Sequence, residues 1–506
     1  MRITDIKFGK LKYCENRGEY TVYSFTDVIE KDYFGFLSSL SNKGYRNVSE
    51  YSLGSCSTTV LDHNGDMLMA TYFPGSKETQ IVTEPKSSYP SFKDHIHAPR
   101  VPALITQIDL EDFGASVVFR IPDGRFIIFD GGWHFEPDAD KLVRCLKEQS
   151  PTDIPVIAAW IFTHPHCDHY RCFSTACEKH AGAFTVERII YNFIDVDSNA
   201  GKFSDLAREK EELLRFDGWV KNSGATVYKA HTGQLYRFGD ASLEMLSTPD
   251  DSCLDSVANM NELSLVVRVN IAGQRVMMCA DANLKALNLV KRYGEYLKSD
   301  ILQPTHHMFN GGDVATYDLI DPSVCVTAGF EEHCLGTFSL YQQKSKEACR
   351  HLLYNMRVED FFAGGHGNVV LALPYSPRHN GKQIYMDKLK EYSRKMGAES
   401  WFFSDMSASD CTFTLTNVSF GEAEVNVDLY GDSASSLVCG ISFKVPPKST
   451  KTLNILDTGA VNPDALYYNP FSLSKNPLKD GARFTVNLKS NIPIVVSGKK
   501  PADYHS

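Results

Sequence analysis

The most informative part of this chain is the stretch IFTHPHCDHY, residues 161–170, which follows the apolar run VIAAW. In extended backbone His164 and His166 project to the same side, and Asp168 and His169 follow where the chain turns into a helix. Imidazole and carboxylate groups are ligands for zinc, and also for iron or manganese. The stretch therefore predicts a metal site at the carboxyl end of a buried strand, where α/β proteins commonly build sites.

Two later strand ends carry the same kinds of side chain. RVMMCADANL, residues 275–284, ends an apolar run in Asp281, and DILQPTHHMFNGG, residues 300–312, ends another in His306 and His307. Any one of these histidines alone is more often structural than a ligand, but their shared position after apolar runs favours a metal site. The three segments are therefore expected to meet at one edge of the fold.

Composition limits the class of protein. A chain of 506 residues with 43% hydrophobic and 23% charged residues indicates a soluble globular protein of two to four domains. The net charge of -10 disfavours nucleic acid as a partner. The start has no apolar signal region and no stretch is long enough to span a bilayer, so no membrane association and a cytoplasmic location are expected. The 13 cysteines, with no C-x-x-C pair, are expected to be reduced thiols.

Three domains are predicted along the chain. Residues 1–95 read as a small α+β domain, in which Asn64 and Gly65 form a hairpin turn, followed by a linker rich in proline and serine. Residues 100–400 alternate strand-like and helix-like runs, as in a layered α/β domain. Residues 405–506 consist of short alternating strands, which predict a β-sandwich of the immunoglobulin or fibronectin kind.

The combination of motifs resembles the metallo-β-lactamase superfamily over residues 100–375. H-x-H-x-D-H after a strand is followed by an aspartate after a later strand and by a histidine pair near a glycine-rich turn. FRIPDGRFIIFDGGW, residues 119–133, is similar to the opening hairpin of that superfamily. The histidine pair, and NELSLVVRV before VMMCADA, resemble the branch that contains the DNA-uptake protein ComEC and phosphorylcholine esterases. The resemblance implies a four-layer αβ/βα sandwich with two divalent ions, zinc first, with manganese or iron as alternatives.

The resemblance also assigns roles to residues. It implies His164 and His166 on the first ion, Asp168 and His169 on the second, and Asp281 between them. One of His306 and His307 completes the second site, and we favour His307, with His306 behind the ligands or facing substrate. The turn Asp130, Gly131 and Gly132 is expected to support the metal-binding loop, although a simple turn former is the alternative.

The chain departs from that pattern at LSTPDDS, residues 246–252. Classical members carry a third histidine ligand there, whereas Asp251 stands at the matching position here and is a candidate substitute. A carboxylate would make the first site poorer in nitrogen and more tolerant of manganese or iron, and it argues against lactam hydrolysis. Outside these motifs His95, His97, His231 and His366 are expected to be loop residues, and the last two could also line a substrate pocket.

These observations predict a metal-dependent hydrolase that uses a metal-bridging hydroxide. The resemblance to the branch with the histidine pair implies a small phosphoester or phosphodiester as the substrate. Asp168 would orient the hydroxide, and His306 or His307 would stabilise developing charge or protonate the leaving group. One alternative is a metal-stabilised scaffold with little turnover, which binds a protein partner through the C-terminal β-sandwich. Another is a nuclease for single strands. Di-iron oxygen chemistry is disfavoured because that branch typically has glutamate where His166 stands.

Overall fold

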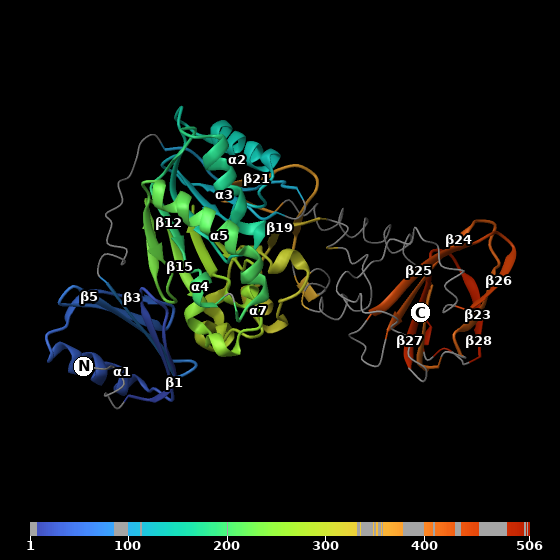
Figure 1. Cartoon of the computed structure of the whole chain (residues 1–506), viewed down its shortest axis with the longest axis horizontal. Helices are drawn as coiled ribbons and strands as arrows, with labels where there is room; N and C mark the ends of the chain where they lie inside the picture. The colour runs from blue at the N-terminus through green and yellow to red at the C-terminus, as the bar shows by residue number, and fades with distance from the viewer. Residues whose placement is uncertain are drawn as a thin grey trace. The chain divides into compact units, whose positions relative to one another are not determined.

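The computed structural model describes residues 8–85, 100–111, 114–199, 201–330, 334, 348, 351–352, 356, 358–377, 399–407, 410–430, 437–454, 483–499, 502 and 504–505. The chain divides into two compact units, Met1–Glu331 with Ala348–Gly381 and Glu332–Glu347 with Lys382–Ser506 (Figure 1). The boundary expected near residue 95, together with His95 and His97, lies outside the described residues.

The first unit begins with an antiparallel sheet covered by one helix. The strand order is β1 (Lys10–Asn16), β2 (Thr21–Thr26), β6 (Glu78–Pro85), β5 (Asp66–Phe73), β4 (Cys56–His63) and β3 (Arg46–Leu53). Helix α1 (Glu30–Ser41) packs Tyr33, Phe36 and Leu40 against one face. The hairpin predicted at Asn64 and Gly65 is confirmed, because β4 and β5 pair across these two residues and both have positive φ.

Two larger sheets form the centre of the first unit. The strand order of one is β13 (Thr226–Lys229), β12 (Arg188–Tyr191), β10 (Val156–Phe162), β9 (Phe126–Phe129), β8 (Val117–Arg120), β7 (Ala103–Gln107) and β21 (Val369–Leu373), with β11 (Thr185–Val186) also paired to β10. The order of the other is β14 (Leu235–Phe238), β15 (Ala241–Ser247), β16 (Val266–Ile271), β17 (Gln274–Met278), β18 (Ile301–Gln303), β19 (Val324–Phe330) and β20 (Asp360–Gly364).

The alternation of side chains along the strands packs these sheets face to face. Ile127 and Phe129 of β9 share one buried core with Val267 and Val269 of β16. The intervening residues of β9 face a second core, to which the helices α2 (Glu136–Gln149), α3 (Cys167–Lys179) and α5 (Ser204–Asn222) contribute. Figure 1 shows these three helices together on one side of the unit.

Helices also cover the outer face of the second central sheet. Arg268 of β16 points away from the shared core and donates to the carbonyl of Tyr296 in the turn η6 (Gly294–Leu297). This turn adjoins α6 (Leu289–Tyr293) and contacts α7 (Val314–Ile320). The layer order is therefore helices, sheet, sheet, helices, and the expected αβ/βα sandwich is confirmed.

The second unit is a β-sandwich, as predicted. One sheet has the order β25 (Leu437–Val445), β24 (Ala423–Tyr430), β27 (Phe484–Ser490), β22 (Glu399–Met406) and β29 (Tyr504–His505), and the other β26 (Ser449–Asn454), β23 (Thr412–Asn417) and β28 (Ile494–Gly498). Phe403, Val425 and Leu488 of the first sheet share a core with Phe413 and Leu415 of the second.

The structure also describes the state of the cysteines and the length of the helices. Every cysteine that the structure describes is a free thiol. None of the helices in those ranges is both long and apolar enough to cross a membrane.

The N-terminal sheet joins the central layers of the first unit through buried charges. His231 is fully buried, and its Nδ1 donates to Asp250 Oδ2 at 2.7 Å while Nε2 lies 3.4 Å from Glu84 Oε2 of β6. Tyr20, just before β2, donates to the other oxygen of Asp250 at 2.8 Å. His231 is thus a hydrogen-bonded residue of the loop between β13 and β14, as expected, and it is also buried in an ionic cluster at this seam.

We predict that His231 makes stability fall as the pH rises above neutrality. Burial opposes its charge, but Asp250 and Glu84 outweigh burial and raise the pKa of His231 to about 9. A histidine whose pKa is raised on folding stabilises fully below its unfolded value of about 6.5, and this contribution is lost as the pH passes the folded value. The loss should reach up to about 3 kcal/mol between pH 6 and 10.

Denaturant unfolding at several pH values measures this dependence. The His231→Asn variant lacks the titrating group, so its stability should fall less steeply than that of the parent over the same range. Equal slopes for the two proteins would show that His231 does not carry the effect.

Candidate metal centre

Three strand ends deliver the predicted metal ligands to one place. His164 follows β10 directly, His166 caps α3, and Asp168 and His169 lie in its first turn. Asp281 follows β17, and the histidine pair follows β18. Because β17 and β18 are parallel neighbours, their carboxyl ends lie side by side.

The first group of side chains comprises Asp168, His169, Asp281 and His307, whose ligand atoms all lie within 4.8 Å of one another. His169 Nε2 lies 3.2 Å from His307 Nε2 and 3.3 Å from Asp281 Oδ1. His307 Nε2 lies 3.2 Å from Asp168 Oδ2. Two nitrogens and two carboxylate oxygens thus point at one small volume.

A second group, His164, His166 and Asp281, adjoins the first. His164 Nε2 lies 3.7 Å from Asp281 Oδ2, whereas the nitrogens of the first group lie nearest to Oδ1. The carboxylate of Asp281 therefore has one oxygen toward each group.

The donor set fits divalent metal ions. His164 Nε2 and Asp281 Oδ1 are buried without any hydrogen-bond partner, and buried polar atoms are ordinarily paired. The ring nitrogens of His169 and His307 face each other at 3.2 Å in the same volume. A cation between these atoms would satisfy all of them, and mixed imidazole and carboxylate donors suit zinc, manganese or iron.

The directions of the pKa shifts in the site also indicate that it favours positive charge. Burial would by itself lower the pKa of His169, but Asp281, Asp168 and Asp130 outweigh it and raise that pKa well above its usual range. Burial opposes the charge of Asp281, yet the surrounding histidines hold its pKa well below the usual value. Burial lowers the pKa of His164, and the neighbouring His169 lowers it further. The carboxylates are therefore charged, and they favour a cation among them.

Asp130 holds His169 in place, as expected for its turn. Its Oδ2 accepts from His169 Nδ1 at 2.8 Å, and Thr163 donates to both of its oxygens. This contact leaves Nε2 of His169 for the metal group. Gly131 and Gly132 donate backbone N–H groups to the carbonyl of His169, and a Cβ on Gly132 would lie 2.3 Å from Leu110 Cδ1.

Asp205 is a second orienting carboxylate, and the sequence reading missed it. It lies at the start of α5, and its Oδ2 accepts from His166 Nε2 at 3.1 Å and from the backbone N–H of Met260 at 2.8 Å. Because Nε2 of His166 is engaged with Asp205, Nδ1 is the ring nitrogen left to bind a metal ion. The only sequence signal was an aspartate in the first turn of a charged helix, which is typical of a helix start.

The adjacent His306 and His307 reach different sides of Asp281. Both have left-handed backbone, with φ of 50° and 48°, held by a hydrogen bond from His306 N to Ala280 O at 2.7 Å. His307 Nε2 lies 3.6 Å from Asp281 Oδ1, and His306 Nε2 lies 3.5 Å from Oδ2. His307 joins the group of Asp168 and His169, whereas His306 belongs to neither group and is partly exposed.

Asp251 is not brought into either group, in contrast to the expectation from its position in the motif. Its Oδ1 accepts from Arg292 at 2.6 Å, and its Oδ2 accepts from Ser247 at 2.7 Å and Thr232 at 2.9 Å. Arg292 is an internal counter-ion that already neutralises the carboxylate. His366 likewise stands apart, exposed between β20 and β21.

The chain is similar to several solved structures at low sequence identity. No family model and no curated protein matches the chain. Among solved structures, the metallo-β-lactamase fold protein YhfI from Bacillus subtilis is 10% identical, with 53% of this chain and 98% of that chain covered and a TM-score of 0.32. Zn²⁺-bound PqqB from Methylobacterium extorquens is 13% identical, with coverages of 51% and 87% and a TM-score of 0.32. CmlA, a diiron β-hydroxylase from Streptomyces venezuelae, is 12% identical, with coverages of 55% and 55% and a TM-score of 0.34.

The central layers have the four-layer αβ/βα order that the resemblance to the metallo-β-lactamase superfamily implies. The layer order and the strand-end histidines carry this resemblance. Identities this low do not extend to function. The closer likeness to the ComEC and phosphorylcholine esterase branch stays a prediction.

Replacing Asp205 by asparagine should weaken metal binding. The amide is a poorer acceptor for His166 Nε2, so this imidazole would be less basic and less well oriented. Loss of such an outer partner typically lowers metal affinity by about 10- to 100-fold. Competition with a chromogenic zinc chelator measures the effect.

Asp197→Asn is the matched control. Asp197 is a carboxylate of the neighbouring helix α4 (Val196–Asn199), and its ion pair with Lys210 is exposed. Equal zinc affinity in the two variants would contradict the role assigned to Asp205.

Proposed function

We propose that this chain is a metal-dependent hydrolase with two divalent ions. The observation that carries the proposal is the carboxylate of Asp281, which is 3% exposed and has one oxygen toward each group of ligands. A buried carboxylate is costly unless charge or hydrogen bonds compensate it. Two cations on either side of it would account for its place and for the histidines around it.

In this proposal His164 and His166 would hold one ion with Asp281, and Asp168, His169 and His307 would hold the second ion with the same carboxylate. Two metal ions bound in this way would supply a water molecule of lowered pKa and a Lewis acid for the bond under attack. Asp168, whose carboxylate is partly exposed, would orient the attacking water and accept its proton.

The partly exposed His306 is the proposed proton donor to the leaving group. Its Nδ1 lies 2.6 Å from Asn310 Oδ1, and its Nε2 lies 3.4 Å from Asn261 Nδ2. These two amide side chains fix the plane of the partly exposed His306 ring. A fixed ring with one face toward solvent can both bind an anionic substrate group and donate a proton.

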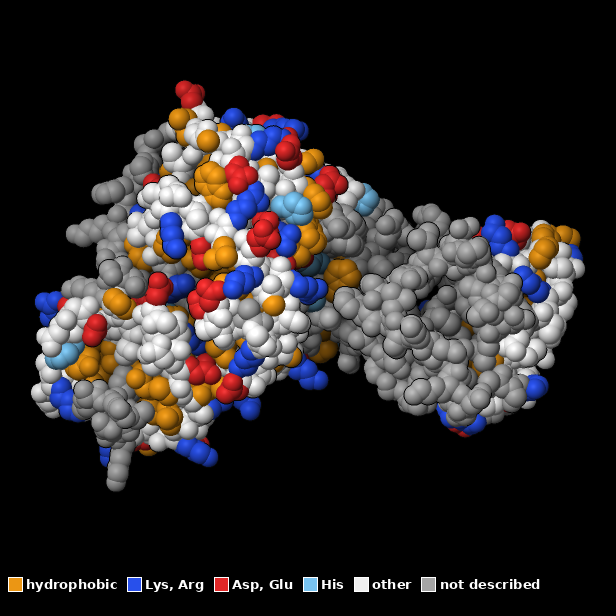
Figure 2. Space-filling model, viewed as in Figure 1, with side chains coloured by type: hydrophobic (Ala, Val, Ile, Leu, Met, Phe, Trp, Pro, Cys, Tyr) orange, Lys and Arg blue, Asp and Glu red, His pale blue; other side chains and the backbone are white. Residues whose placement is uncertain are grey.

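A small phosphoester or phosphodiester is the proposed substrate class, because a two-metal centre suits an anionic transition state. The net charge of -10 argues against a long nucleic acid. On the face shown in Figure 2, the described acidic and basic side chains are interspersed and form no basic stripe. Zinc is the proposed native metal, with manganese or iron as alternatives for this mixed donor set.

Asp281→Asn should abolish turnover. The amide has one acceptor oxygen and no charge, so it cannot serve both groups, and kcat/KM should fall at least about 100-fold. Hydrolysis of chromogenic phosphomonoesters, phosphodiesters, thioesters and lactams, each with zinc and with manganese, measures the loss. Asp255→Asn is the control and should keep full activity, because Asp255 pairs with Lys202 on the surface.

The same assays decide between the enzyme and a metal-stabilised scaffold. Bound metal together with turnover of a phosphoester supports the proposal. Bound metal without turnover of any substrate class would favour the scaffold, and purified protein that takes up no metal would overturn the metal centre itself.

A further inference from the structure

The segment of residues 250–263 connects the N-terminal sheet to the metal centre. It follows β15, passes through short turns and ends just before β16. At its start Tyr13 of β1 donates to the carbonyl of Asp250, and Tyr20, just before β2, donates to the side chain of the same residue. The β1–β2 hairpin therefore binds the first residue of the segment through two tyrosines.

The hairpin also binds the next part of the segment through a buried ion pair. Arg17 Nη2 donates to Ser252 O at 2.6 Å and to Glu15 Oε2 at 2.7 Å. The other oxygen of Glu15 accepts from the backbone N–H of Leu254 at 3.0 Å. The side chain of Arg17 is only 3% exposed, so these contacts are shielded from water.

The far end of the segment contacts the metal centre. Met260 donates its backbone N–H to Asp205 Oδ2, the oxygen that also accepts from His166. Asn261 Nδ2 lies 3.4 Å from His306 Nε2. Met260 is fully buried in the helix-side core, which fixes the position of this turn.

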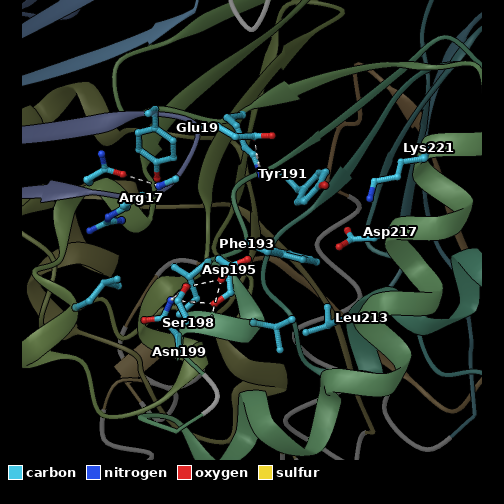
Figure 3. A pocket seen from close by; sticks show the side chains of 17 residues that line it. Arg17, Glu19, Tyr191, Phe193, Asp195, Ser198, Asn199, Leu213, Asp217 and Lys221 are labelled. Carbon is cyan, nitrogen blue, oxygen red and sulfur yellow. Dashed lines mark hydrogen bonds and ion pairs between the residues drawn. The ribbon is translucent and has the colours of Figure 1, made fainter.

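Polar contacts hold the turn of the hairpin against the central layers, together with an edge contact between the rings of Tyr20 and His231. Figure 3 shows Arg17 and Glu19 beside a cavity whose other walls carry Tyr191, Asp217 and Lys221. The cavity has a volume of about 500 Å³. Beside this cavity, the hydrogen bonds of Tyr13, Tyr20, Glu15 and Arg17, and the packing of Cys253 against the hairpin, connect it to the 250–263 segment.

We propose that the β1–β2 hairpin positions the 250–263 segment and, through Met260 and Asn261, the imidazoles of His166 and His306. Arg17 and Glu15 are positioning residues of the metal centre, although they belong to the N-terminal sheet. The inference rests on the proposed two-metal function for its effect on metal binding, but the order of the segment can be measured without metal.

Arg17→Met, compared with Arg125→Met, tests the proposal in the full chain. Arg125 is an equivalent buried arginine that pairs with Asp123 two residues earlier, as Arg17 pairs with Glu15. Arg125 lies just before β9, at the opposite end of that strand from Asp130, and its ion pairs are with Asp123 and Glu187. The pair thus separates loss of a buried ion pair from loss of the link.

We expect Arg17→Met to speed backbone hydrogen exchange of residues 252–263 about tenfold, because it removes buried hydrogen bonds from that segment. Arg125→Met should leave this exchange as in the parent. With Co²⁺ as the probe, Arg17→Met should weaken binding about three- to tenfold and change the visible absorption spectrum, since two ring orientations relax. Arg17→Lys keeps one donor for Ser252 O and should restore part of both effects.

Each outcome bears on one claim. Unchanged exchange of residues 252–263 in Arg17→Met would overturn the positioning role, whether or not metal binds. Faster exchange with parental Co²⁺ affinity and spectrum would overturn the connection to the histidines. Failure of the parent to bind Co²⁺ would contradict the proposed function alone, because the exchange comparison is still made on metal-free protein.

Discussion

The structure of the centre depends on one desolvated carboxylate. Asp281 is buried at the meeting point of three strand ends, and the imidazoles of His164, His169, His306 and His307 surround it within 3.7 Å. Removing a carboxylate from water is expensive, so such an arrangement persists only where positive charge or donors compensate it. The parallel pairing of β17 with β18 and the packing of the two sheets place the compensating groups there. The fold and the demand for cations are therefore two aspects of the same constraint.

The candidate ligands could be predicted from sequence because each set of them follows the end of a strand. A polar side chain directly after an apolar run is a local signal, and parallel strands bring such ends to one edge. Asp205 carries no comparable signal, because the charged stretch around it has the composition of a solvated helix face. Its partner His166 is 39 residues away, and only the packing of α5 against α3 brings the two together. Orienting groups of this kind depend on tertiary contacts that a motif does not contain.

Asp251 shows the opposite error. The motif suggested a metal ligand, but the neighbouring side chains already bind its carboxylate. The turn has the expected place after β15, but its carboxylate meets Arg292 and two hydroxyl groups. Arg292, the partner that neutralises it, lies 41 residues away in sequence and could not be inferred from the turn. The sequence also carried information about the N-terminal sheet. Strand β5 is apolar and is buried along nearly its whole length, which indicates a sheet covered on both faces.

The contacts of the Asp251 turn and the covering of the N-terminal sheet are physically connected. The carboxylates of this turn pair with Arg17, His231 and Arg292, so they cannot also bind a metal. The group of His164 and His166 therefore has fewer ligands from this turn than the superfamily pattern suggests. In return the turn is fixed by the N-terminal sheet, and the residues that follow it reach Asp205 and His306. A ligand set with fewer histidines depends more strongly on the orientation of those it has. The added sheet supplies this orientation, which gives it a role in the centre without contributing a single ligand.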